Sequence, residues 1–76
     1  MERKRPLADP SALKLLGKKV IKLRKEKGIS QEKLAIAAGI ERSYMGAIER
    51  GERNPSYDKL VSISKALGIL VSELVK

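Results

Sequence analysis

The sequence predicts an all-α protein built as a single domain. Apolar residues recur at spacings of three and four along several segments, which is the period of an amphipathic helix. Aromatic residues make up 3% of the chain, and alternating patterns extend over only a few positions, so strands are not expected. Gly and Pro separate the helix-period segments. A length of 76 residues supports one small core.

A basic arm and a long helix open the chain. Residues 1–10 are polar and contain two prolines, so we expect a flexible arm there and the folded domain over 11–76. The first helix is predicted over about 12–27, with Ser11 as its N-cap residue. Five residues share its apolar arc: Ala12, Leu13, Leu16, Val20 and Leu23.

Basic residues of this helix fall into two environments. Arg24 lies at the edge of the apolar arc, where a partly buried guanidinium needs a carboxylate partner. A stripe on another face is expected to be solvated, and its field would attract a polyanion over some distance. It consists of Lys14, Lys18, Lys22 and Lys25.

Four shorter helices follow the first. One is predicted over 31–38 after the capping residue Ser30, and another over about 42–50. A fourth begins after Ser56, which can cap it, and shows apolar residues at helical spacing. A last short helix is predicted over about 71–75.

Net charge is the strongest compositional signal. The chain has 17 Lys and Arg against nine Asp and Glu, a formal charge of +8, which points to a polyanionic partner, either nucleic acid or an anionic membrane surface. Residues 1–27 hold ten basic and three acidic side chains, so they carry most of the excess. Residues 28–54 are neutral, with four of each sign, so any affinity there must come from oriented contacts.

Several function classes are disfavoured by composition. The chain has no Cys and no His, which excludes disulfides, a Cys/His zinc site, a Cys nucleophile and a His base. We therefore expect no enzyme, no metal, no cofactor and no small-molecule substrate. No apolar run approaches the roughly 20 residues of a membrane-spanning helix, and no signal region follows the first residues. We expect a cytoplasmic protein with no membrane partner.

Residues 31–50 have the pattern of a helix-turn-helix. Ala35 is small enough for two helices to approach, and Gly39 can adopt the left-handed conformation of a sharp turn. Arg42 opens the second of these helices, where such a helix usually meets base edges. Apolar side chains fill the space beneath: Leu34, Ile40, Met45 and Ile48. The opposite face is small and polar, which suits a major groove: Ser43, Gly46, Ala47 and Arg50.

Residues 16–75 resemble the phage-repressor/Cro-type helix-turn-helix family, often called XRE-like. The similarity rests on an ordered series of motifs rather than on one. They are Leu16-Gly17, Leu23-Arg24, Gly28-Ile29-Ser30-Gln31-Glu32-Lys33-Leu34-Ala35, Ala38-Gly39-Ile40, Ile48-Glu49-Arg50-Gly51, Asn54-Pro55-Ser56 and Ala66-Leu67-Gly68. The resemblance implies a compact five-helix, repressor-like DNA-binding domain.

The resemblance also implies roles for individual residues. Gln31 would contact phosphate and support the recognition helix, and Arg24 would pair with Glu49. Base reading is assigned to the face of the recognition helix: Arg42, Ser43, Tyr44 and Ala47. Phosphate contacts are assigned to Gln31, Arg50, Arg53 and Asn54. The competing interpretation is that these are ordinary solvated side chains, with Tyr44 packed in the core.

Details of the recognition helix resemble the controller proteins of restriction–modification systems, which are short homodimeric regulators. The matching residues are Glu41-Arg42-Ser43-Tyr44-Met45, Ile48-Glu49-Arg50 and Arg53-Asn54. Three positions depart from the wider family. Glu41 and Leu70 stand where a smaller polar N-cap residue is usual. Gly46 lies inside a helix, where glycine lowers helix stability by about 1 kcal/mol relative to alanine.

Together these observations predict a sequence-specific transcriptional regulator that binds double-stranded DNA. Because so small a domain reads few base pairs, we expect a homodimer on a palindromic operator, with the third helix in the major groove. Apolar residues near the C-terminus are the candidate dimer interface: Ile69, Leu70, Val71, Leu74 and Val75. The alternative function is a protein-interaction module on the same fold, such as an antitoxin or coactivator head.

Overall fold

The computed structural model describes residues 9–75, and this range contains five α-helices and no strand. They are α1 (Pro10–Glu26), α2 (Gln31–Ala38), α3 (Arg42–Glu49), α4 (Tyr57–Leu67) and α5 (Val71–Val75). The all-α prediction is confirmed, and the predicted bounds differ from these by no more than two residues. The arm predicted over 1–10 lies mostly outside the described residues, so the division into arm and domain stays a prediction.

The start of α1 corrects one prediction. Asp9, not Ser11, is the N-cap residue, and its Oδ1 accepts hydrogen bonds from the Ser11 N–H at 2.9 Å and the Ser11 hydroxyl at 2.8 Å. The reason is Pro10, whose fixed φ angle suits the first helical position and which has no N–H to satisfy. The helix therefore begins before the serine that the pattern suggested.

The other helices begin largely as expected. The Ser30 hydroxyl accepts the Lys33 N–H at 3.0 Å, and the Ser56 hydroxyl accepts the Lys59 N–H at 3.3 Å. At α5, where Leu70 cannot cap, the Glu73 carboxylate reaches back and accepts the Leu70 N–H at 3.0 Å. This is one half of a capping box, so the short helix begins without a polar cap residue.

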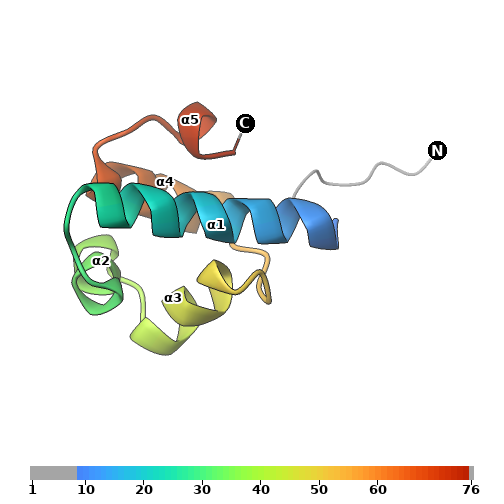
Figure 1. The fold of residues 1–76 in the computed structure, drawn as a ribbon, viewed down its shortest axis with the longest axis horizontal. Coiled ribbons are helices and arrows are strands. Elements are labelled where there is room, and N and C mark those ends of the chain that lie inside the picture. The colour runs from blue at the N-terminus through green and yellow to red at the C-terminus, as the bar shows by residue number, and fades with distance from the viewer. Residues whose placement is uncertain (1–8, 76) are drawn as a thin grey trace.

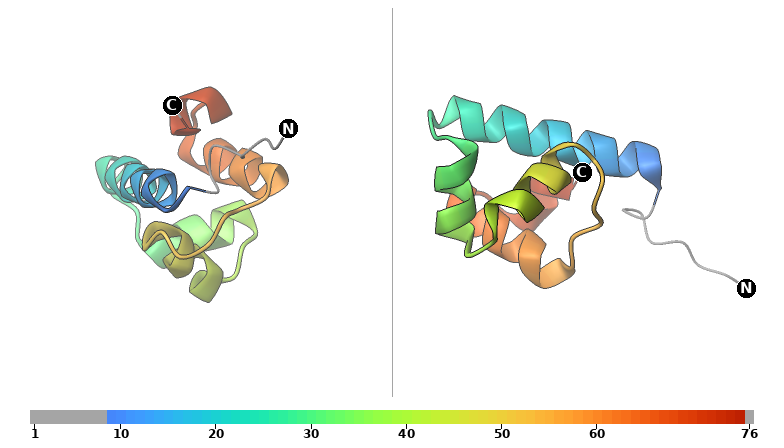
Figure 2. Two further views of the ribbon diagram at one scale, coloured as in Figure 1. Left: turned by 90° about the vertical axis from the view of Figure 1, so that its right-hand side faces the viewer. Right: turned by 90° about the horizontal axis from the view of Figure 1, so that it is seen from below.

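The helices enclose one core, with α1 running along the length of the molecule (Figure 1). Figure 1 and the left-hand view of Figure 2 show α2 and α3 on one side of α1 and α5 on the other. In the interior α2 packs against α3 and α4, while α1 packs against α3 and α5. The buried apolar residues come from all five helices: Leu16, Val20, Leu34, Ala35, Ala38, Met45, Ile48, Leu60, Ile63, Leu67 and Leu74.

The α1–α3 contact depends on Gly17. This residue is buried, and a Cβ atom placed on it would lie 2.7 Å from the Ile48 carbonyl oxygen and still closer to that of Glu49. Both atoms belong to the backbone of α3 and cannot rotate away. The glycine therefore sets how closely the two helices approach, and α3 is held against α1 by its last turn.

We predict that Gly17→Ala destabilises the protein by about 3 kcal/mol or more, because overpacking against backbone forces the helices apart. Thermal unfolding would then shift down by about 10 °C or more. Gly46→Ala is the matched control, since its Cβ would meet the flexible Arg50 side chain at 3.1 Å and alanine favours the helix. Equal melting temperatures for the two variants would contradict this account of the α1–α3 contact.

Candidate nucleic-acid interface

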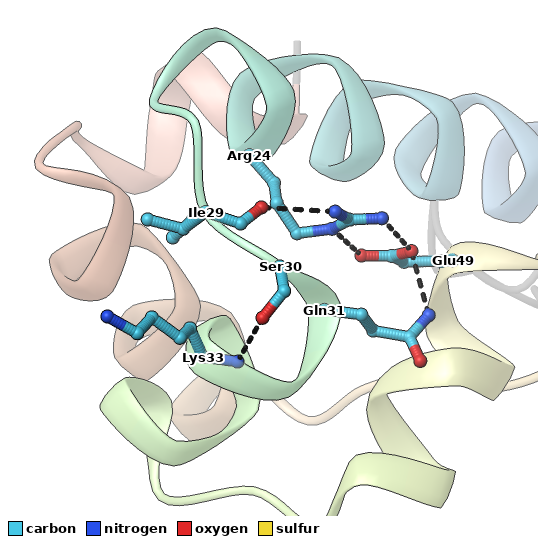
Figure 3. A network of polar contacts seen from close by, with 6 residues as sticks. All are labelled: Arg24, Ile29, Ser30, Gln31, Lys33 and Glu49. Carbon is cyan, nitrogen blue, oxygen red and sulfur yellow. Dashed lines mark hydrogen bonds and ion pairs between the residues drawn. The ribbon is translucent and has the colours of Figure 1, made fainter.

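A polar network joins the first three helices (Figure 3). The Arg24 guanidinium on α1 donates to both carboxylate oxygens of Glu49 on α3, from Nε to Oε2 at 2.8 Å and from Nη2 to Oε1 at 3.1 Å. Arg24 Nη1 also donates to the Ile29 carbonyl oxygen at 3.2 Å. Gln31, the first residue of α2, donates from Nε2 to Glu49 Oε1 at 2.9 Å. The carboxylate is therefore shared between α1 and α2.

The ion pair between Arg24 and Glu49 is largely buried. The Arg24 and Glu49 side chains are 13% and 4% exposed, and a two-pronged guanidinium–carboxylate contact is the strongest geometry for such a pair. The hydrogen bonding of Arg24 to the Glu49 carboxylate raises the pKa of Arg24, the negative charge of Glu49 adds to this rise, and desolvation only partly opposes it. Arg24 thus stays charged, and it supplies the counter-charge that the nearly buried Glu49 requires.

The outer face of α3 is presented to solvent. Arg42 and Ser43, in its first turn, are exposed, and Ala47 is half-buried one turn further on. Arg50, just past the helix, is exposed and forms a surface ion pair with Glu52 at 3.1 Å. A shallow hollow lies between the start of α2 and this face, lined by Gln31, Arg42, Ser43, Gly46 and Arg50. The hollow therefore brings together residues predicted to read bases, Arg42 and Ser43, and residues predicted to bind phosphate, Gln31 and Arg50.

Gly46 lies on the outer face of α3, as expected, and lines the hollow there, but it is not open to solvent. The residue is buried, because side chains from α2 and from the end of α3 cover it. An added Cβ would lie 3.4 Å from Gln31 Oε1 and 3.1 Å from Arg50 Nη1. The glycine makes room for these two side chains, and this packing offsets its poor helix propensity.

Tyr44 lies on the flank of α3 that borders the core, and it is half-buried there. Two cations form cation–π contacts with its ring: Arg53 Cζ and Lys59 Nζ each lie 5.3 Å from the ring centroid. Arg53 and Asn54 are exposed in the loop between α3 and α4. No sequence pattern indicates Lys59, because only the fold brings the first turn of α4 beside α3.

The C-terminal apolar residues divide into two groups. Leu70 is 69% exposed and Val75 is 39% exposed, whereas Ile69 and Val71 are half-buried against the core. Leu74 is 1% exposed and belongs to the core of this chain. Its assignment to the dimer interface is therefore wrong, because the short α5 turns this side chain inward. The remaining four residues are available on the surface in whole or in part.

The described residues hold no group of three or more acidic, Cys or His side chains that could bind a metal ion. Within 9–75, no helix combines the length and the apolar character needed to cross a membrane. The four lysines of the α1 stripe are exposed, as predicted.

Comparisons with known proteins assign the chain to a family. A family model described as helix-turn-helix (HTH_3) matches residues 20–74. Control protein C.BamHI of Bacillus amyloliquefaciens is 47% identical over 62 residues, spanning 80% of this chain and 76% of that protein. The chain therefore belongs to this helix-turn-helix family, which confirms the resemblance drawn from its motifs.

Solved structures agree with this membership. The restriction–modification controller protein C.AhdI of Aeromonas hydrophila superimposes with a TM-score of 0.83 at 42% identity, covering 84% of this chain and 97% of that one. The biofilm regulator SinR, crystallised in complex with DNA, superimposes with a TM-score of 0.77 at 39% identity, covering 80% and 98%.

We predict that Glu49→Ala destabilises the fold by about 3–5 kcal/mol, because it leaves the Arg24 charge largely buried and unpaired. Chemical denaturation measures this directly. Glu52→Ala serves as the control, since it removes a carboxylate from an ion pair whose two side chains are 61% and 58% exposed, and such pairs contribute little. An unfolding free energy for Glu49→Ala equal to that of the control would show that the network does not stabilise the fold.

Proposed function

We propose that the protein is a sequence-specific regulator of transcription that binds double-stranded DNA. One observation carries the proposal: the first turn of α3 presents Arg42 and Ser43 to solvent beside Gln31, on a helix fixed by the buried Arg24–Glu49 pair. A recognition helix needs this combination, because base reading requires both exposed side chains and a rigid mount. The relative SinR, crystallised with DNA, supports the same function.

The contacts follow from the chemistry of the exposed groups. Arg42 can donate two hydrogen bonds to a guanine edge, Ser43 can donate or accept, and the Ala47 methyl suits a thymine methyl. Gln31, Arg50, Arg53 and Asn54 surround this face and carry donors for phosphate oxygens. Gln31 donates one amide hydrogen to Glu49, and its second amide hydrogen can be donated to a phosphate of the DNA backbone.

We propose further that two copies bind a palindromic operator. One recognition helix reads only a few base pairs, and two-fold pairing places two such helices about 34 Å apart, one turn of DNA. The exposed Leu70 and Val75, with Ile69 and Val71 beside them, form the candidate interface. Similarity to C.BamHI and C.AhdI favours a controller of a restriction–modification system over other short repressors.

We place this DNA-binding protein in the cytoplasm and assign it no catalytic reaction. Its alternative, a protein-interaction module on the same fold, would use the partner surface and not the groove-facing side chains. Arg42 distinguishes the two, because its exposed side chain would be dispensable for the alternative.

We predict that Arg42→Ala weakens binding to the preferred operator by about 1–3 kcal/mol and relaxes the preference at one base position. Titration of an operator selected from a random DNA pool, against unrelated DNA of equal length, measures both effects. An equal loss on the two DNAs would assign Arg42 to phosphate instead of a base.

We predict that Leu70→Glu converts a dimer into a monomer, because it places a charge in an apolar contact between two copies. Sedimentation at micromolar concentration would show the mass falling from twice 8.4 kDa to that value. A parent protein that sediments as a monomer at every concentration would defeat the proposed pairing.

A further inference from the structure

A second hollow borders α3, on the flank away from Gln31. It is lined by Gly39, Ile40, Glu41, Tyr44 and Lys59, where the α2–α3 turn meets the first turn of α4. The Tyr44 ring forms part of it, and the Lys59 ammonium and the Arg53 guanidinium both approach that ring to 5.3 Å. Two cations from different segments are thus gathered at one aromatic side chain.

The two hollows lie on opposite flanks of one helix. Gly46 lines the first hollow and Tyr44 lines the second. At about 100° per residue these positions are about 160° apart around the helix axis. The exposed face of α3 lies between the two hollows. If this face enters the major groove of DNA, each hollow lies near one wall of the groove.

Lys59, which lines the second hollow, and Arg53, which lies at the ring of Tyr44, are both available to a ligand. Neither Arg53 nor Lys59 forms an ion pair with any residue between 9 and 75, although Arg24 and Arg50 each do. Glu41 also lines the hollow, and its carboxylate offsets one of the two charges. Because two cations lie at the Tyr44 ring and one carboxylate lines the hollow, the local charge is positive and favours an anion. A cation that sits on an aromatic ring is also held in place with less loss of freedom on binding.

We propose that Lys59 binds a DNA phosphate, and that Tyr44 is a positioning residue that holds Lys59 and Arg53 toward the same backbone. The inference rests on the proposed function. The walls of a major groove about 12 Å wide belong to the two opposite strands. Gln31 and Arg50 would meet one strand, and Arg53 and Lys59 the other, which fixes the depth and the register of α3. Tyr44 thereby acts through its ring face and not by reading a base.

Salt dependence of binding tests the role of Lys59. The probe is the duplex selected by the parent protein, titrated over a series of salt concentrations. Lys59→Gln is expected to reduce the slope of log K against log salt by about 0.9, the value for one phosphate contact. Lys65→Gln is the charge-matched control on the same helix, because Lys65 is exposed in its last turn. Equal slopes for the two variants would overturn the proposal.

Substitution of the ring tests the positioning role. Tyr44→Phe keeps the ring face and should keep the parent slope, whereas Tyr44→Leu should lower it. In an Arg53→Gln, Lys59→Gln background, Tyr44→Leu should change the slope no further. A loss of operator preference in Tyr44→Phe would instead assign the hydroxyl to a base and overturn the positioning role.

Two controls keep these outcomes distinct. Thermal unfolding of each variant shows whether it folds, and should Tyr44→Leu fail to fold, Tyr44→Phe and Lys59→Gln still decide the question. A parent protein that binds no DNA would overturn the proposed function together with this inference. A parent that binds, with Lys59→Gln indistinguishable from Lys65→Gln, would overturn the inference alone.

Discussion

The arrangement of this domain depends on the Glu49 carboxylate, which is almost fully buried and shared by two other helices. Arg24 binds it from α1 and Gln31 binds it from α2, while Glu49 itself ends α3. A helix of eight residues with an internal glycine and no side-chain cap would not be stable alone. The carboxylate, together with the close approach at Gly17, fixes where that helix lies and how it is turned.

Charge is distributed so that attraction and recognition are separate. The first 27 residues carry most of the positive excess, and the exposed lysines of α1 belong to this part. The helix-turn-helix segment has no net charge, so its affinity depends on where individual side chains point. General attraction can therefore act at a distance, while the neutral segment discriminates between sequences only after contact.

Much of this architecture follows from the sequence, for reasons that differ between residues. Helical spacing, capping serines and terminal glycines determine local structure, so the bounds of α2 and α4 could be predicted. The position of Arg24 on its helix called for a carboxylate, but only the family resemblance identified Glu49. Gly17, Lys59 and the burial of Gly46 could not be predicted, because each depends on a neighbouring helix whose approach no local pattern encodes. Leu74 was misassigned for the same reason.

The outward turn of α3 has a consequence for how such a protein changes over generations. Arg42 and Ser43 are exposed and take no part in the core or in the Arg24–Glu49–Gln31 network. Substitution at exposed positions of this kind usually alters stability by less than about 0.5 kcal/mol. New side chains can therefore be tried at these two positions on an intact scaffold, and preference for a DNA site can drift while the fold stays constant.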